Sequence, residues 1–225
     1  MLLLKQHADW ILFALVAFLF VVFPQLDLWV SGWFYDPDSH SWPMNDNAVV
    51  MSIYELLRYG PFFIVPLLLA AVAMTFVKHG IDKAQRRIWV FLLVGLLAGP
   101  GLLVHSVFKE VFERPRPRAV QEFGGTETFE PAFVVSEKCQ RSCTSFVSGH
   151  SAMGFWLMAF AWVFRRRSWL WAGIIVGSLA SAGRIVQGGH FLSDTLVSGF
   201  ICYFVYRGFS WWLLGHSRIQ EPATR

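Results

Sequence analysis

Residues 88–108 read IWVFLLVGLLAGPGLLVHSVF, an apolar stretch that contains no Asp, Glu, Lys or Arg. A helix needs about 20 mostly apolar residues to cross the hydrocarbon layer of a membrane, and this stretch meets that length. Arg86 and Arg87 directly precede it, and Lys109 follows it at once. Charges that stop at both ends of an apolar run are typical of a transmembrane helix, because charged groups are costly inside the bilayer.

The composition extends this interpretation to the whole chain. Of its 225 residues, 55% are hydrophobic and only 15% are charged, whereas soluble domains carry about 25% charged residues. In a soluble protein, a net charge of +4 would suggest a nucleic-acid partner. Here the cations cluster between apolar stretches and no nucleic-acid-binding motif is present. We therefore assign the cations to membrane anchoring and anion binding, and expect no nucleic acid as a partner.

Five further apolar stretches resemble residues 88–108. The first of them, at the N-terminal end of the chain, is closed by Pro24 rather than by a small-residue cleavage site, which favours a retained helix over a signal peptide. We find no repeat and no low-complexity segment, so residues 1–225 are expected to form a single membrane-embedded domain. The sequence predicts an all-α integral membrane bundle of six transmembrane helices, at roughly residues 9–26, 60–77, 88–108, 149–165, 168–187 and 192–214.

Lysine and arginine residues are concentrated in alternate connections. They lie in the connections 78–87 and 165–167 and in the C-terminal tail, namely Lys78, Lys83, Arg86, Arg87, Arg165, Arg166, Arg167, Arg218 and Arg225. The connection 27–58 is acidic instead, with Arg58 as its only basic residue. Cytoplasmic connections carry the excess of positive charge. Both termini are therefore expected in the cytoplasm, with 27–58, 109–148 and 184–191 on the external face.

Three short motifs lie on this expected external face, each at the edge of an apolar stretch. They are Lys109-(six residues)-Arg116-Pro117, Ser148-Gly149-His150 and Arg184-(five residues)-His190-(three residues)-Asp194. Together they supply three cations, two imidazoles and one carboxylate. This is the set needed to bind a phosphate, attack it and protonate the leaving group, and the apolar surroundings favour a phosphate attached to a lipid.

The cations and the second motif are suited to binding phosphate. Arg116 and Arg184 can each donate paired hydrogen bonds to phosphate oxygens, while Lys109 acts as a point charge. Ser148 and Gly149 are expected at a helix N-terminus, where free backbone N–H groups attract anions. Taken singly, a cation could be an interfacial anchor and the serine an ordinary helix cap, but their joint occurrence favours a phosphate site. Two neighbouring arginines are assigned only to contacts with the lipid headgroup: Arg114 and Arg118.

His190 and Asp194 are four residues apart at the expected start of the last helix, so their side chains would share one face. A carboxylate there fixes the imidazole tautomer and raises its basicity, which prepares the other nitrogen to attack phosphorus. The alternative is that Asp194 only caps the helix. Gly188 and Gly189 are expected to allow close approach to the phosphoryl group. The motifs contain no carboxylate cluster that would hold a metal, so we expect no metal and no other cofactor.

The two cysteines of the 109–148 connection, Cys139 and Cys143, are expected in an oxidising compartment, which favours a disulfide. A zinc site is the alternative, although a pair of cysteines without nearby His or further Cys is a poor ligand set. Cys202 lies within an apolar stretch and is expected to be a packing residue.

The three motifs resemble the signature of the type-2 phosphatidic acid phosphatase family, and the resemblance runs from the third apolar stretch to the end of the sixth. It implies metal-independent hydrolysis of a phosphoester through a phosphohistidine. It further implies that His190 is the nucleophile, that Asp194 orients it and that His150 is the general acid. The phosphate would be bound by Lys109, Arg116, Ser148, Gly149 and Arg184. Two positions depart from the family pattern: Val147 replaces a usual Pro, and Gly183 a usual Ser.

A looser resemblance concerns the substrate. Residues 27–35, DLWVSGWFY, and 143–156, CTSFVSGHSAMGFW, are similar to the bacterial lipid A 4'-phosphatase group. This implies an enzyme of the bacterial inner membrane that hydrolyses a lipid phosphomonoester or pyrophosphate at the periplasmic face. Phosphatases of undecaprenyl pyrophosphate, phosphatidate or phosphatidylglycerol phosphate stay open, as do a lipid phosphotransferase and a non-catalytic lipid-binding protein. The expected partners are the lipid substrate and the bilayer, and the sequence does not determine the oligomeric state.

Overall fold

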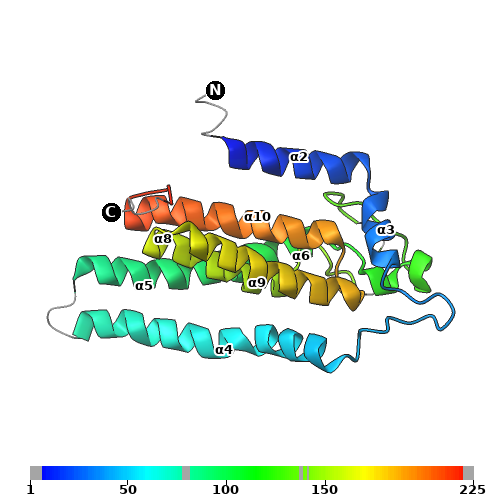
Figure 1. Ribbon diagram of the computed structural model, residues 1–225, viewed down its shortest axis with the longest axis horizontal. Coiled ribbons are helices and arrows are strands. Elements are labelled where there is room, and N and C mark those ends of the chain that lie inside the picture. Colours follow the sequence, from blue (N-terminus) through cyan, green and yellow to red (C-terminus); the bar gives the residue numbers. More distant parts are fainter. Residues whose placement is uncertain (1–6, 78–81, 137–138, 141, 220–225) are drawn as a thin grey trace.

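The computed structural model describes residues 7–77, 82–136, 139–140 and 142–219, and these residues form an all-helical protein (Figure 1). Within this part of the chain, extended pairing is limited to two isolated bridges, Asp36 with Ser41 and Val120 with Glu127. The prediction of an all-α fold is confirmed. Both chain ends, together with Lys78 and Arg225, lie outside the described residues.

Most of the helices run along the long axis of the molecule, whereas α3 crosses it at one end (Figure 1). The first half of the chain contains α2 (Ala8–Val22), α3 (Gln25–Gly32), α4 (Ala48–Val77), α5 (Lys83–Leu96), the π-helix η1 (Leu97–Phe108), α6 (Lys109–Phe112) and the 3-10 turns η2 (Pro117–Ala119) and η3 (Gln121–Phe123). The second half contains α7 (Gly149–Phe155), the 3-10 turn η4 (Trp156–Ala159), α8 (Phe160–Phe164), α9 (Arg167–Val186), α10 (Leu192–Phe209) and the π-helix η5 (Ser210–Leu214).

Three helical stretches are long and apolar enough to cross a membrane: Ala48–Val77, Lys83–Ala119 and Arg167–Val186. The pair Ala8–Val22 and Gln25–Gly32 makes a fourth if it counts as one span, although the two helices meet at an angle of 84°. The described residues thus contain three or four such spans, and the predicted six are not confirmed. The helical segment 149–164 is short, and polar residues such as Asp194 and Arg207 lower the hydropathy of α10.

Two expected boundaries differ from the structure. α4 begins at Ala48 rather than near residue 60, so part of the expected connection 27–58 is helical. Its start is set by Asn47, whose Oδ1 accepts hydrogen bonds from the backbone N–H groups of Val49 and Val50 at 3.0 and 3.2 Å. A capped first turn satisfies backbone donors that would otherwise lack partners. α2 ends at Val22, two residues before Pro24, which precedes α3.

The hydrophobic core lies among α5, η1, the segment formed by α7, η4 and α8, and the helices α9 and α10. It contains large side chains that are almost fully buried, such as Phe91, Trp162 and Tyr206. α7 packs closely on α9: Gly177 of α9 lies so near the ring of Phe155 that a Cβ at this position would overlap the ring. This packing holds α7 against α9, and the second and third motifs lie at the ends of α7, α9 and α10, while the first lies on α6 and the segment that follows it.

The outer surfaces of α2 and α4 are strongly apolar. Among their exposed side chains are Leu15, Phe18, Phe62 and Leu67, each at least 60% exposed. An exposed apolar surface of this extent indicates a contact with lipid or with another protein. For α4, which is long enough to span a bilayer, lipid is the simpler explanation. The same holds for α2 if it forms one span with α3.

Candidate active site

The structure brings the three predicted motifs together at one end of the bundle. Lys109 begins α6, Ser148 caps α7 and Arg184 lies in the last turn of α9. The charges of Lys109, Arg116 and Arg184 all act on the ring of His150. Those of the two arginines also act on His190. Residues that are far apart in the sequence therefore surround one site.

His190 lies in the turn between α9 and α10 and is 1% exposed. Its Nδ1 is 2.7 Å from the backbone oxygen of Ser145, which can only accept, so Nδ1 carries the proton and donates it. Burial lowers the pKa of His190 to about 3, because the charged imidazolium loses its hydration. At neutral pH the ring is therefore uncharged, and Nε2 keeps the lone pair that a nucleophile needs.

Asp194 combines the two roles that the sequence left as alternatives. Its Oδ2 accepts a hydrogen bond from the N–H of Phe191 at 2.8 Å, which caps α10. The same oxygen accepts from the hydroxyl of Ser145 at 2.6 Å and lies 3.7 Å from Nδ1 of His190. The carboxylate is thus too far away to hydrogen-bond the imidazole, but close enough to stabilise positive charge on it. The carbonyl of Ser145 sets the ring orientation.

The prediction that Arg114 contacts a lipid headgroup is wrong, because this side chain is 1% exposed. Its Nη1 donates to Oδ1 of Asp194 at 2.5 Å and to the hydroxyl of Ser193 at 2.9 Å. Its Nη2 donates to Oδ2 of Asp27 at 2.9 Å, and its Nε to the backbone oxygen of Glu130 at 2.8 Å. Arg114 therefore acts inside the protein, where it holds the carboxylate beside His190.

Asp27 is the second carboxylate of this arrangement, and it was counted above only as an acidic residue of an external connection. It is fully buried in α3, and its two oxygens also accept hydrogen bonds from the N–H and the hydroxyl of Ser193, at 2.9 and 2.5 Å. We call Asp27, Arg114, Ser193 and Asp194 the Arg114 network. Asp27 stands alone between Leu26 and Leu28, and such an isolated ionisable residue in an apolar segment usually has a buried partner. This was the one signal that could have revealed it.

Three atoms at the site keep unused hydrogen-bonding capacity. Nε of Arg116, Nε of Arg184 and Nε2 of His150 are buried and have no hydrogen-bond partner among the described residues. The other ends of both arginines are fixed, since Nη2 of Arg116 donates to Oγ1 of Thr144 at 2.9 Å and Nη1 of Arg184 to Oε1 of Gln187 at 2.6 Å. Buried polar atoms nearly always have partners. An anion bound between the two arginines and His150 would supply them.

Tyr54 of α4 is a site residue that the sequence analysis missed. Its ring stacks on that of His150 with centroids 4.5 Å apart, and Cζ of Arg184 lies 4.8 Å from its centroid. Tyr54 therefore holds an imidazole and a guanidinium, through stacking and cation–π attraction. No motif marks this tyrosine, and only the packing of α4 against α7 and α9 brings it to the site.

Gly188 and Gly189 make room for side chains of the protein. A Cβ at Gly188 would overlap the ring of Trp42, and this glycine has φ of +61°, a conformation that other residues rarely adopt. A Cβ at Gly189 would overlap the guanidinium of Arg184. The two glycines thus allow the close approach of Trp42 and of Arg184, a cation predicted to bind phosphate, rather than of a phosphoryl group.

Ser148 connects the second motif with the third. Its backbone N–H donates to the backbone oxygen of Asp194 at 3.3 Å, and its own backbone oxygen accepts from the hydroxyl of Ser198 at 3.0 Å. Its Oγ accepts from the hydroxyl of Ser151 at 2.9 Å, which leaves the proton of Ser148 available to a ligand. The start of α7 is thereby held against the first turns of α10.

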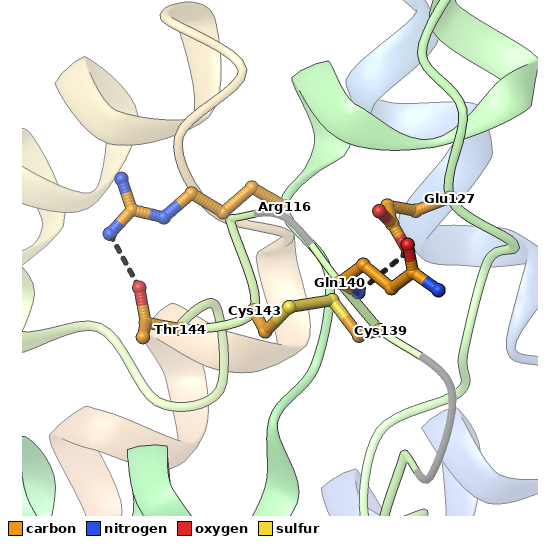
Figure 2. The surroundings of a disulfide bond; sticks show 6 residues. All are labelled: Arg116, Glu127, Cys139, Gln140, Cys143 and Thr144. Atoms are coloured by element: carbon orange, nitrogen blue, oxygen red, sulfur yellow. Dashed lines mark hydrogen bonds between the residues drawn. A yellow bond between two sulfur atoms is a disulfide. The ribbon is translucent and has the colours of Figure 1, made fainter.

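Cys139 and Cys143 are joined by a disulfide, with their Cα atoms 5.8 Å apart (Figure 2). The bonded sulfurs are not available as zinc ligands. The loop that the disulfide closes contacts Arg116 on both sides of Cys143. The N–H of Arg116 donates to the backbone oxygen of Ser142 at 3.2 Å, and its guanidinium reaches Thr144 (Figure 2). The segment around the disulfide therefore positions Arg116, one of the arginines predicted to bind phosphate.

An apolar cavity of about 380 Å³ adjoins the charged site. It lies between α4, the η1 segment and α7, and its apolar lining includes Leu57, Phe62 and Met153. Lys109 and His150 also line it. The groups that can bind and protonate a phosphate ester are thus continuous with a groove that can hold a hydrocarbon chain.

Comparisons with known proteins agree with this geometry. The family model of the PAP2 superfamily matches residues 88–218. A protein of Francisella tularensis subsp. novicida (strain U112) named lipid A 4'-phosphatase is 35% identical over 189 residues, covering 82% of this chain and 84% of that protein. A protein of Rhizobium leguminosarum with the same name is 33% identical over 210 residues, covering 84% of this chain and 87% of that protein. No solved structure gives a significant match.

Proposed function

Since the chain belongs to the PAP2 superfamily, we propose that it is a membrane lipid phosphatase that removes the 4'-phosphate of lipid A through a phosphohistidine on His190. The names of its relatives support the substrate. The structural observation that carries the proposal is the apolar cavity that opens onto Lys109 and His150. A lipid phosphate would place its headgroup between the cations and a hydrocarbon chain in the cavity.

In the first step, the phosphate accepts hydrogen bonds from Nε of Arg116 and Nε of Arg184, which have no partner among the described residues. Both arginines keep their hydrogen bonds to Thr144 and Gln187. Nε2 of His190 attacks phosphorus, a P–N bond forms, and the P–O bond to the sugar breaks. The leaving oxygen takes a proton from His150, whose protonated form is favoured by the negative charge of the bound phosphate. The positive charge on the phosphorylated ring is stabilised by Asp194, 3.7 Å from Nδ1.

In the second step, water attacks phosphorus from the side that the leaving group has vacated. His150 is now neutral and accepts a proton from this water. The P–N bond breaks, and inorganic phosphate leaves with His190 again uncharged. Lys109, Arg116 and Arg184 stay in contact with the phosphoryl oxygens through both steps and stabilise the charge of each transition state.

The direct test of the substrate is phosphate release by the purified protein from four lipids: lipid A, undecaprenyl pyrophosphate, phosphatidate and phosphatidylglycerol phosphate. We expect lipid A to react fastest, and mass spectrometry of its product to show loss of the 4'-phosphate alone. Inorganic phosphate should equal the lipid A consumed, which separates hydrolysis from transfer to another lipid. Turnover of another lipid with none of lipid A would contradict the proposed substrate.

We also propose that the six helical segments all span the inner membrane and that the site faces the periplasm. The basic connections support this orientation. They adjoin the end of α4, the start of α9 and the end of α10, which all lie at one end of the bundle, whereas α3, at the start of the acidic connection, lies at the other (Figure 1). In a variant without Cys139, Cys143 and Cys202, single cysteines at Asp38 or Arg166, both exposed, would report the orientation. In spheroplasts, a membrane-impermeant maleimide should label the Asp38→Cys protein and leave the Arg166→Cys protein unlabelled. Labelling of the Arg166→Cys protein alone would contradict the proposed orientation.

A further inference from the structure

Two adjoining cavities lie away from the candidate active site, between the beginning of α2, the first half of α9 and α10. The first measures about 490 Å³ and is lined by Arg167, Arg207 and Arg218. The second measures about 300 Å³ and has a mainly apolar lining, which includes Leu12 and Phe200. Three residues line both cavities: Asp9, Leu170 and Tyr203. The two cavities therefore adjoin along these three side chains, and we call the pair the α2 groove.

The wide part of the α2 groove carries positive charge. Asp9 forms an ion pair with Arg207, and among the described residues that line this cavity it is the only acidic one. The described lining contains three arginines and one carboxylate, since Arg167 and Arg218 line it as well. Both are exposed, so a ligand can reach them. Arginine side chains present planar donors that bind phosphate groups well.

The narrow part of the α2 groove is apolar and runs toward the middle of the bundle. Its lining comes from α2, the α7–η4 segment, α9 and α10, with Leu12, Phe155 and Ile174 among the contributors. On one side of it, α2 is fixed to α10 by aromatic contacts, such as the stacking of Trp10 on Phe204 with centroids 3.8 Å apart. A cavity with a cationic mouth and an apolar interior matches a molecule with an anionic head and a hydrocarbon tail.

We propose that the α2 groove binds an anionic phospholipid, with its phosphate at Arg167, Arg207 and Arg218 and one acyl chain in the apolar part. The charge of the mouth selects an anionic over a zwitterionic headgroup, and the apolar interior selects a lipid over a free anion. The groove is separate from the candidate active site, because α9 begins at Arg167 and reaches the site only in its last turn, at Arg184. The bound lipid joins α2 to α9 and stabilises the folded protein by mass action.

The test compares thermal unfolding of the delipidated protein in a neutral detergent with dioleoyl phosphatidylglycerol or dioleoyl phosphatidylcholine added. We expect a saturable rise in Tm with the first lipid only. Arg167→Gln combined with Arg218→Gln should remove most of this rise. Arg165→Gln combined with Arg166→Gln is the matched control, since it removes the same charge from the same connection but outside the groove, and it should keep the rise. Equal responses of the two double variants would overturn the proposal.

A second variant tests the acyl chain without a change of charge. Ser178 is exposed, and its side chain lines the apolar part, so Ser178→Phe should fill that part and reduce the rise in Tm caused by phosphatidylglycerol. Glycerol 3-phosphate, which has the headgroup charge and no chain, should give no rise. A full rise with glycerol 3-phosphate, or an equal rise with phosphatidylcholine, would show that the α2 groove does not select an anionic lipid.

Discussion

Arg114 and Arg116 are separated only by Pro115, yet their environments are opposite. Arg114 is buried among Asp27, Ser193 and Asp194, and each nitrogen of its guanidinium donates a hydrogen bond. The guanidinium of Arg116 is held at one end by Thr144, while its buried Nε has no partner among the described residues. Satisfied polar groups stabilise a fold, whereas unsatisfied ones are costly unless a ligand completes them. Arg114 therefore holds the site together, whereas Arg116 keeps a donor for a ligand, which we propose is the substrate phosphate.

The same division applies to the two histidines. The ring of His190 is fixed by the carbonyl of Ser145 and by its complete burial. His150 stacks on Tyr54, but its Nε2 has no partner among the described residues. A nucleophile needs a fixed direction of attack, whereas an acid must reach the leaving oxygen of a bound ester. The predictions below test this division between groups that hold the site and groups that bind the phosphate.

The largest effect is expected from Arg114→Gln. The substitution leaves the carboxylates of Asp27 and Asp194 buried without their cation, and loss of one partner from a buried ion pair costs about 3–5 kcal/mol. We expect a large drop in Tm in detergent and loss of activity. The additional substitution Asp27→Asn should restore part of the stability, because it removes one of the two uncompensated charges. An unchanged Tm in Arg114→Gln would show that the Arg114 network does not hold the site.

A smaller effect on the fold, but a strong one on catalysis, is expected from Arg116→Gln. We expect Tm to stay close to that of the wild type and kcat/KM to fall by about 10²–10³-fold, the range for loss of one transition-state donor. Arg118→Gln removes the same charge from the same segment; because Arg118 is exposed and is expected only to contact the headgroup, its loss should lower kcat/KM far less. A drop in Tm with unchanged turnover would assign Arg116 to the structure rather than to the substrate.

The smallest effect is expected from removal of the disulfide by Cys139→Ser combined with Cys143→Ser. A disulfide that closes so short a loop contributes about 2 kcal/mol by the chain-entropy estimate. The loop also holds Arg116 through Ser142 and Thr144, so KM should rise several-fold with a smaller change in kcat. Steady-state kinetics with and without dithiothreitol on the wild type checks this. A kcat that falls more than KM rises would mean that the loop acts on the chemical step.

The sequence identified the cations that gather around His150 better than the residues that hold the site together, and their binding of phosphate stays a prediction. Lys109, Arg116 and Arg184 are recognisable because each belongs to a short local pattern: Lys109 precedes Arg116 by seven residues, and Arg184 precedes His190 by six. The partner of Arg114 is 87 residues away in Asp27, and no local pattern connects an arginine beside a proline with a carboxylate in an earlier apolar stretch. Tyr54 was missed for the same reason, because only the packing of α4 brings it to the site.

The all-α fold followed from hydropathy, but the number of spans did not. Asp194 and Arg207 carry roles that keep polar groups inside α10, so this helix is less apolar than a span that only anchors the protein. Average hydropathy also does not detect the cap by Asn47, which starts α4 earlier than expected, or the bend between α2 and α3, which ends α2 earlier than expected. Polar groups that pair with other segments therefore lower the hydropathy from which spans are predicted.

We propose that His190 carries the phosphoryl group, which can be tested by rapid-quench trapping with lipid A labelled by ³²P at the 4'-phosphate. Wild-type protein should show an acid-labile, alkali-stable label within the first turnover, located at His190 by peptide mapping. The His190→Ala protein, with a Tm near that of the wild type, should carry no label and release no phosphate. Substantial phosphate release by the correctly folded His190→Ala protein would contradict the account.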